Sequence, residues 1–254
     1  MPRPLRTYRT HALVLRHRDM GEADRLITIL TPEHGKMDCV AKGARKPATS
    51  KTGHVELFTH TDLLIAKGSS LDIVTQAQMQ NPYLILHEDL LRGAYASYCV
   101  ELMDRFTQED DVDNAKLFYL LDATFERLCY DDDVRRVVRY YEMQLLNLAG
   151  FKPQLMECII THELVVPEDQ FFSYSEGGVV SSEGAVHTNN LIALPVETLK
   201  LMRHLQRTKD YSKLHSLKIG DVLHNDIERV MVGFIRYILE SKLRSIEFIR
   251  LLQH

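Results

Sequence analysis

The sequence is short of cysteine and has no long apolar run. The first ten residues, MPRPLRTYRT, lack the apolar core of a signal peptide. No apolar run approaches the roughly 18 residues that a membrane span needs. The cysteines show no spacing of a disulfide framework. These absences predict a cytoplasmic protein with no membrane partner. The four cysteines are Cys39, Cys99, Cys129 and Cys158.

Catalytic motifs are also missing. There is no GxGxxG and no GxxxxGK[ST], so neither a dinucleotide fingerprint nor a P-loop is present. Lys51-Thr52-Gly53 spells KTG, but no serine is followed three residues later by lysine, as penicillin-binding enzymes require. His162-Glu163 lacks the second histidine of HExxH. We therefore expect no catalytic residues, no enzyme activity and no small-molecule substrate.

Two acidic runs, 110–111 and 131–133, raise the question of a metal site. Neither run has the spaced oxygen ligands of a calcium loop. Solvated loops between helices are the interpretation that we favour.

Charge is divided unevenly along the chain. Residues 1–53 hold 11 Lys or Arg against 5 Asp or Glu, a local charge of +6. The remainder holds 20 basic and 30 acidic residues, a charge of −10. A solvated face is the ordinary explanation of such a run, whereas a cationic end also suits an anionic partner.

The stretch VAKGARKPATSKTGH, residues 40–54, contains four cations and no acid. Its Gly and Pro residues disfavour a helix, and its charges cannot be buried unpaired. We expect a mobile loop that follows a strand and binds an anion. The four cations are Lys42, Arg45, Lys46 and Lys51.

Up to about residue 80 the apolar residues alternate with polar ones, which indicates strands. Five short strands in about 70 residues suit a small closed barrel, and a five-stranded OB barrel fits best. The expected strands are 11–17, 24–31, 36–42, 57–66 and 71–77.

Beyond Pro82 the apolar period becomes 3.6, which indicates helices. The fold class is therefore α+β, with domains at 1–80 and 81–254. The expected helices are 83–105, 113–130, 134–149, 195–207 and 226–239.

A segment at about 151–190 has the layout of a zinc ribbon without its ligands. Such a ribbon places CxxC before a hairpin and CxxC at its end. One thiolate with two hydroxyls and a glycine cannot form the ligand shell that zinc favours. His162 and His187 are weaker substitutes, and a hairpin held by Phe171, Phe172, Tyr174 and Val179 is the simpler interpretation. The four positions here are Cys158, Thr161, Ser181 and Gly184.

Four segments together resemble the bacterial recombination mediator RecO family, over nearly the whole chain. They are ALVLRHRDMGEADRLITILTPEHGKMDCVAKGARK at 12–46, YYEMQLLNLAGFKPQLMEC at 140–158, FSYSEGGVV at 172–180 and RYILESKLRSIEFIRLL at 236–252. The family has an N-terminal OB domain, a helical body and a zinc-ribbon-like insert. The chain departs from it at three of the four zinc positions, so we expect the zinc site to be lost and no cofactor to be bound.

The resemblance implies a DNA-binding recombination mediator in DNA repair. Family members bind single- and double-stranded DNA and anneal complementary strands. They act with RecR to load RecA onto DNA coated by single-strand-binding protein (SSB). The expected partners are therefore DNA, RecR and the C-terminal tail of SSB, at the nucleoid in the cytoplasm.

The OB domain offers the expected DNA contacts. A basic, glycine-containing loop beside an OB face can bind phosphates without reading bases. Tyr8 and His11 suit base stacking, although Tyr8 equally suits packing on the barrel, and Asp24 with Arg25 suits a pair that stabilises a turn. The expected DNA-binding residues are Lys42, Arg45, Lys46 and Lys51, followed by Arg9, Arg16 and Arg25.

The acidic, Phe-ended SSB tail needs an apolar slot beside a cation. On 134–149, Arg135 and Arg136 have acids four residues earlier and suit simple surface pairs. Arg139 has no such acid, so we expect its guanidinium to be the freest. The expected tail-binding residues are Arg139, Arg135, Arg136 and Tyr140, with Met143 alongside.

Two alternatives remain. Charge alone does not select DNA over RNA, so an OB-fold RNA-binding protein fits the barrel equally well. A protein scaffold that acts through its acidic helical body is the second alternative.

Overall fold

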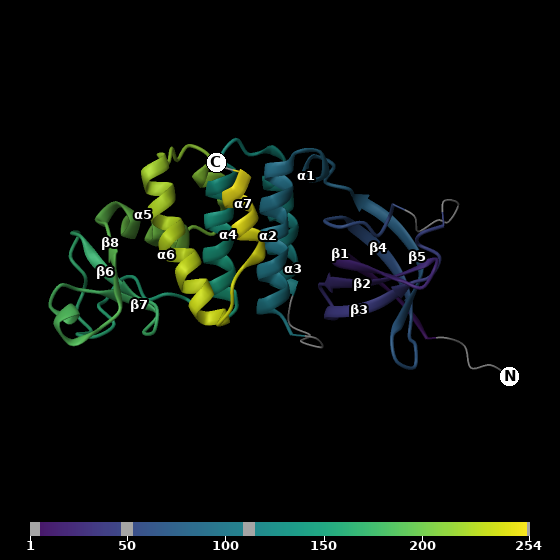
Figure 1. Cartoon of the computed structure of the whole chain (residues 1–254), viewed down its shortest axis with the longest axis horizontal. Coiled ribbons are helices and arrows are strands. Elements are labelled where there is room, and N and C mark those ends of the chain that lie inside the picture. The colour runs from purple at the N-terminus through teal and green to yellow at the C-terminus, as the bar shows by residue number, and fades with distance from the viewer. Residues whose placement is uncertain (1–5, 47–52, 109–114, 253–254) are drawn as a thin grey trace. The chain divides into compact units, whose positions relative to one another are not determined.

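Figure 1 shows the computed structural model of the chain, which describes residues 6–46, 53–108 and 115–252. Among these residues, no helix is long and apolar enough to cross a membrane.

Contacts group the chain into two compact units. The first comprises residues 1–131 with 248–254, and the second comprises 132–247. The first unit contains the five N-terminal strands and also the helices that follow them. This grouping does not separate the strands from those helices, so the expected boundary near residue 80 stays a prediction.

The N-terminal strands close into a barrel in the order β1-β2-β3-β5-β4 (Figure 1). β1 pairs with both β2 and β4, and β3 runs parallel to β5, so the barrel has no open edge between these strands. This is the arrangement of an OB fold, and the predicted five-stranded barrel is confirmed. The strands are β1 (Thr7–Met20), β2 (Asp24–Thr31), β3 (Gly35–Ala41), β4 (His60–Ala66) and β5 (Asp72–Asn81).

Some predicted strand ends differ from the observed ones. The difference comes from strand pairing and from backbone conformation, which apolar periodicity does not detect. β1 extends beyond 11–17 at both ends, because each end pairs with a different neighbour. β4 begins at His60 and not at 57, because Phe58 has a positive φ of 61°, which interrupts extended backbone. β2 has the bounds that were predicted.

Side chains that point into the barrel form its core. Alternation along each strand sends every second residue inward, which matches the pleat of a strand. Ala44, shortly after β3, and Val55, before β4, are also buried in this core. The core residues on the strands are Ala12, Val14, Ile27, Ile29, Cys39, Ala41, Leu63, Ile65 and Val74.

Helices of the first unit cover part of the outer barrel surface. Leu13 and Leu30 pair across β1 and β2 and are fully buried, although they alternate with the core residues. His60, opposite Leu13, contacts the ring of Phe118 on α3. The helices are α1 (Ile85–Glu88), α2 (Leu90–Phe106) and α3 (Ala115–Tyr130).

The expected helix 83–105 is divided at Asp89. The backbone there is extended, and the carboxylate accepts hydrogen bonds from the N–H groups of Leu91 and Arg92. Asp89 thus caps α2, which ends α1 after one turn.

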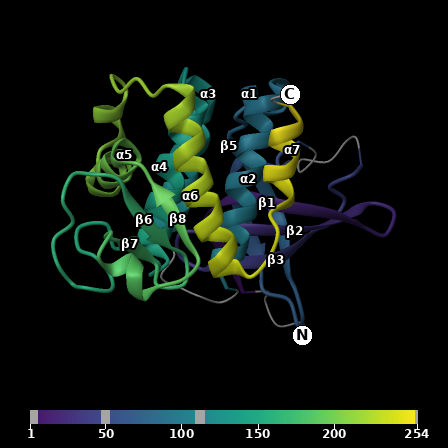
Figure 2. The ribbon, with the colours of Figure 1, turned by 60° about the vertical axis from the view of Figure 1, so that its left-hand side comes forward.

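The second unit combines three helices with a small sheet of order β7-β6-β8. Figure 2 shows α6 alongside β8, and Phe172 of β6 contacts Phe234 of α6 with ring centroids 5.4 Å apart. The hairpin is thus held by an aromatic residue, as expected. The elements are α4 (Val134–Leu148), β6 (Gln170–Ser173), β7 (Gly178–Val180), η1 (Gly184–His187), β8 (Leu191–Leu194), α5 (Val196–Arg207), η2 (Tyr211–Leu214) and α6 (Asp221–Leu239).

Two helical segments were missed or cut short by the sequence prediction. α6 begins at Asp221, five residues before the predicted start, and α7 (Arg244–Leu252) was not predicted. Three of the five residues that precede the predicted start of α6 are polar, namely Asp221, His224 and Asn225, so the apolar period of its first turn is weak.

Candidate nucleic-acid interface

The basic turn follows β3 directly, as expected. Residues 42–46 form turns, and the side chains of Lys42, Arg45 and Lys46 are exposed. Gly43 has a φ of 72°, and its N–H donates to Asp24 Oδ1 at 2.8 Å, which shapes the turn. Lys51 lies outside the described residues.

Arg45 ties this turn to the β1–β2 turn. Its Nη1 donates to the carbonyl oxygens of Gly21 at 3.1 Å and Glu22 at 3.3 Å, and its Nε lies 3.4 Å from Asp19 Oδ2. About 37% of the Arg45 side chain is still exposed. Arg45 therefore holds two barrel turns together and keeps part of its guanidinium at the surface.

The outer surface of β1, β2 and β3, here called the β1–β3 face, carries further cations. Arg16 and Arg18 alternate outward on β1 and line a hollow together with Leu26, Thr28 and Asp38. The Asp38 carboxylate accepts a 2.6 Å hydrogen bond from the Thr28 hydroxyl. This is the side on which OB folds bind oligonucleotides.

Asp104, at the end of α2, partly neutralises the edge of this face. Lys36 is nearly buried and donates to the Asp104 carbonyl at 2.6 Å and to Oδ1 at 3.1 Å. Arg16 Nη1 lies 3.5 Å from Asp104 Oδ2, yet 65% of the Arg16 side chain is exposed. Arg18 was not among the predicted residues. Side chains two residues apart on a strand point to the same face, so its position after Arg16 could have identified it.

Arg25 is placed differently from the other predicted cations. It is 19% exposed and lies 2.7 Å from Glu56 and 3.6 Å from Asp19. The expected partner Asp24 instead accepts from Gly43. Arg25 thus stabilises the barrel, and its predicted DNA contact has no support from this geometry.

Tyr8 packs on the barrel, which was one of its two expected roles. Its hydroxyl donates to Asp72 at 2.8 Å, and its ring contacts His34. Burial and then this hydrogen bond to a carboxylate raise the pKa of Tyr8 above its ordinary value. Tyr8 is therefore held by Asp72 at the start of β5 and by His34.

Arg9 and His11 lie on another outer surface, formed by β1, β4 and β5 and here called the β4–β5 face. Register places Arg9 opposite Leu64 and His11 opposite Asp62. His11 Nδ1 is 3.5 Å from Asp62 Oδ1. The strand order thus separates Arg9 from the basic turn after β3.

The α4 guanidiniums are engaged within the second unit. Arg135 pairs with Asp221 at 3.4 Å and also donates to Asn225. Arg136 is buried, and its Nη1 donates to the Leu217 carbonyl at 2.7 Å. These contacts are made to residues 217–225, and not to Asp131 and Asp132, the acids expected four residues earlier.

The expectation that Arg139 is the freest guanidinium is wrong. Its side chain is 1% exposed, with Nη1 3.2 Å from Glu142 and Nη2 3.8 Å from Glu228. Tyr140 is also buried and donates to the Lys209 carbonyl. The prediction considered only an acid four residues before Arg139. Arg139 instead pairs with Glu142, three residues later, and with Glu228 on α6.

The four zinc-ribbon positions are brought together. Cys158 Sγ accepts from the backbone N–H of Thr161 at 3.4 Å and of Ser181 at 3.3 Å. A Cβ on Gly184 would lie 2.9 Å from the same sulfur. Burial raises the pKa of the Cys158 thiol, but hydrogen bonds from Ser181 and Thr161 lower it to about 6. In the described residues, no group of three or more His, Cys, Asp or Glu suits a metal ion.

Comparisons with known proteins cover the whole layout. A family model described as Recombination protein O N terminal matches residues 5–83, and one described as Recombination protein O C terminal matches residues 87–247. The chain belongs to the RecO family. This result confirms the resemblance and does not favour the RNA-binding and scaffold alternatives.

Several curated proteins named DNA repair protein RecO are similar along their length. One from Roseiflexus sp. is 36% identical over 244 residues, which cover 96% of this chain and 85% of that protein. One from Heliobacterium modesticaldum is 34% identical over 246 residues, covering 95% and 88%. One from Dehalococcoides mccartyi is 30% identical over 239 residues, covering 94% and 93%.

Proposed function

We propose that this chain is a DNA repair protein that acts as a recombination mediator, by binding and without catalysis. It binds single- and double-stranded DNA and anneals complementary strands. Together with RecR it loads RecA onto single strands coated by SSB, at the nucleoid.

The observation that carries the proposal is the group of exposed cations around one side of the barrel. Arg16 and Arg18 lie on the β1–β3 face, and the basic turn of Lys42, Arg45 and Lys46 follows β3. Phosphate contacts of this kind give affinity that falls with salt and does not depend on sequence. Such binding suits a protein that must act on any strand.

Competition between DNA and RNA tests the choice of nucleic acid. Labelled single-stranded DNA bound to the chain is displaced by unlabelled DNA or RNA of the same sequence. The proposal predicts that DNA competes better, together with faster annealing of complementary DNA strands in the presence of the chain. Equal competition and no annealing would favour the RNA-binding alternative.

The SSB tail requires a new location, because the α4 guanidiniums are engaged. We place it in a groove of the second unit lined by Phe151, Lys152, Phe234, Arg236 and Tyr237. Phe151 and Tyr237 are exposed aromatic residues, and the two cations are exposed beside them. An apolar slot beside a cation is what an aromatic C-terminal residue needs, although Glu176 and Glu240 also line the groove.

A labelled tail peptide distinguishes the groove from α4. Lys152→Glu with Arg236→Glu should weaken binding at least about fivefold, because a carboxylate loses its cations. Arg135→Glu is the matched control, since Arg135 is the most exposed cation of the predicted α4 set. Loss of binding in Arg135→Glu alone would return the site to α4.

A further inference from the structure

The β4–β5 face contains a hollow of about 320 Å³ that is lined in part by polar side chains. Arg9 comes from β1, and Gln76 and Gln78 come from β5. Among the described residues, none of these three side chains has a hydrogen-bond or ion-pair partner, and all three are exposed. They offer donors and acceptors to a ligand.

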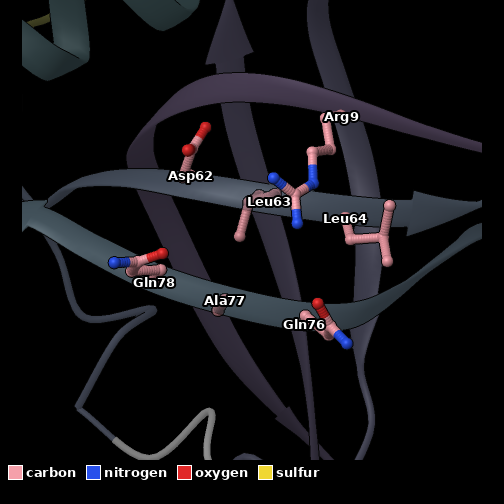
Figure 3. A pocket seen from close by; sticks show the side chains of 7 residues that line it. All are labelled: Arg9, Asp62, Leu63, Leu64, Gln76, Ala77 and Gln78. Atoms are coloured by element: carbon pink, nitrogen blue, oxygen red, sulfur yellow. The ribbon is translucent and has the colours of Figure 1, made fainter.

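Leu64 supplies the apolar side chain on the floor of the hollow, because Leu63 belongs to the barrel core and Ala77 packs against that core. Leu64 lies between Arg9 and Gln76 in register, and Ala77 separates the two glutamines along β5. Figure 3 shows the Arg9 guanidinium reaching over Leu63 on β4, with Gln76 and Gln78 on the next strand. A flat group with apolar faces and polar edges suits this combination of floor and rim, and a nucleobase is such a group.

Charge and topology disfavour other ligands. Arg9 is accompanied by Asp62, so the hollow has no surplus of positive charge for a phosphate or an acidic peptide. Asp62 is held by His11 at 3.5 Å, which leaves the Arg9 guanidinium available. The strands of this face are paired on both sides, so no edge is open to an added peptide strand.

We propose that this hollow binds an unpaired guanine of single-stranded DNA, an inference that rests on the proposed DNA-binding function. The Arg9 guanidinium donates two hydrogen bonds to O6 and N7, which is the commonest specific contact to guanine. The Gln76 and Gln78 amide oxygens accept from N1–H and N2–H₂ on the Watson–Crick edge. Arg9 lies across β4 from Gln76, and neighbouring strands are about 4.8 Å apart. Arg9 and the glutamines can therefore contact two edges of one base from the two sides of β4.

The hollow therefore gives the barrel a second contact, distinct from the cations of the β1–β3 face. Those cations hold the phosphates of a strand, whereas the hollow adds a base preference. A preference at one position slows sliding at guanine without preventing binding elsewhere.

Oligonucleotides of about 16 dT residues, with and without one central guanine, test the inference. Anisotropy titrations measure the two affinities at raised salt, because salt weakens the contribution of the phosphate contacts. The full chain should bind the guanine-containing strand about fivefold to tenfold more tightly. Equal affinities would overturn this inference, and no binding to either strand would overturn the proposed function as well.

Variants then locate the preference. Arg9→Lys keeps the charge but cannot donate two parallel hydrogen bonds, so it should keep the affinity for dT and lose the guanine preference. Gln76→Ala with Gln78→Ala should do the same. Gln80→Ala changes an exposed glutamine of β5 outside the hollow and should keep the preference. A guanine preference that survives in Arg9→Lys and in the double variant would overturn the assignment.

Discussion

The cations of the barrel and those of α4 look alike in sequence and have opposite roles. Arg16 is 65% exposed and Arg45 37% exposed on the barrel. Arg139 on α4 is 1% exposed, and Arg136 is also buried. Arg16 and Arg45 keep part of their guanidinium groups exposed to an external anion, whereas Arg135 and Arg139 pair with acids of their own unit.

The difference arises from what packs around each cation. A cation on a strand of a small barrel alternates with core residues and points to solvent. A cation on a helix that packs against other helices can point into the interior, where only a paired charge is tolerated. Mutations should therefore affect stability in one set and salt-dependent binding in the other.

The largest expected effect is at Arg139. Arg139→Met should lower the free energy of unfolding by about 3–5 kcal/mol. The substitution removes the cation beside the carboxylates of Glu142 and Glu228, and the negative charge of Glu142 is fully buried. Urea unfolding of the full chain measures this loss. Adding Glu142→Gln should recover part of it, because the fully buried charge is then also removed; a double variant as unstable as the single one would contradict the pairing.

The next effect concerns Asp133, which caps α4 through the Arg136 N–H and contacts His224 Nε2 at 3.2 Å. Asp133→Ala should cost about 1–2 kcal/mol, and Asp133→Asn should cost less, because asparagine also caps helices. Thermal unfolding of both variants at neutral pH measures the difference. Equal losses would show that the charge, and not the cap, provides the stability.

Asp133 also gives a pH dependence with a definite sign. Burial raises the pKa of its carboxyl, but hydrogen bonds from His224 and the Arg136 N–H lower it below the ordinary value. A lowered pKa stabilises the fold above the ordinary value of about 4, and the contribution is lost as pH falls through the folded value. The wild type should lose more stability than Asp133→Asn between about pH 5 and pH 2.

A smaller effect separates two cations of the same turn. Arg45→Ala should cost about 0.5–1 kcal/mol, since its contacts with Gly21, Glu22 and Asp19 are partly exposed. Lys42→Ala should stay within about 0.5 kcal/mol, because Lys42 is exposed. Chemical unfolding of the two variants provides the comparison, and equal losses would remove the linking role of Arg45.

Metal removal should have no effect on folding. A fold that depends on structural zinc unfolds when the zinc is removed by a chelator. We expect less than stoichiometric zinc by elemental analysis and an unchanged unfolding midpoint with a chelator. One zinc per chain, lost together with the fold, would show that other residues replace the missing ligands at Thr161, Ser181 and Gly184.

The barrel was predictable because short-range alternation decides it. All five strands and the basic turn after β3 were found from periodicity and turn residues. The ends of helices and strands were less predictable, since Asp89 at the start of α2 and Phe58 before β4 act through single backbone conformations.

The sites were less predictable than the elements. The burial of Arg139 depends on Glu228, which lies on another helix. The hollow of Arg9, Gln76 and Gln78 requires the strand order, which places β1 and β5 on either side of β4. Such relations follow from tertiary structure and leave no local pattern.

The salt dependence of single-stranded DNA binding tests the central claim most directly. The barrel variant replaces Arg16, Arg18, Lys42 and Lys46 with Ala, and the control replaces four exposed cations of the second unit, Lys200, Arg207, Lys213 and Lys218. The slope of log K against log salt should fall by roughly 0.7 for each lost phosphate contact in the barrel variant, and it should stay unchanged in the control. Equal slopes in the barrel variant and the wild type would contradict the account.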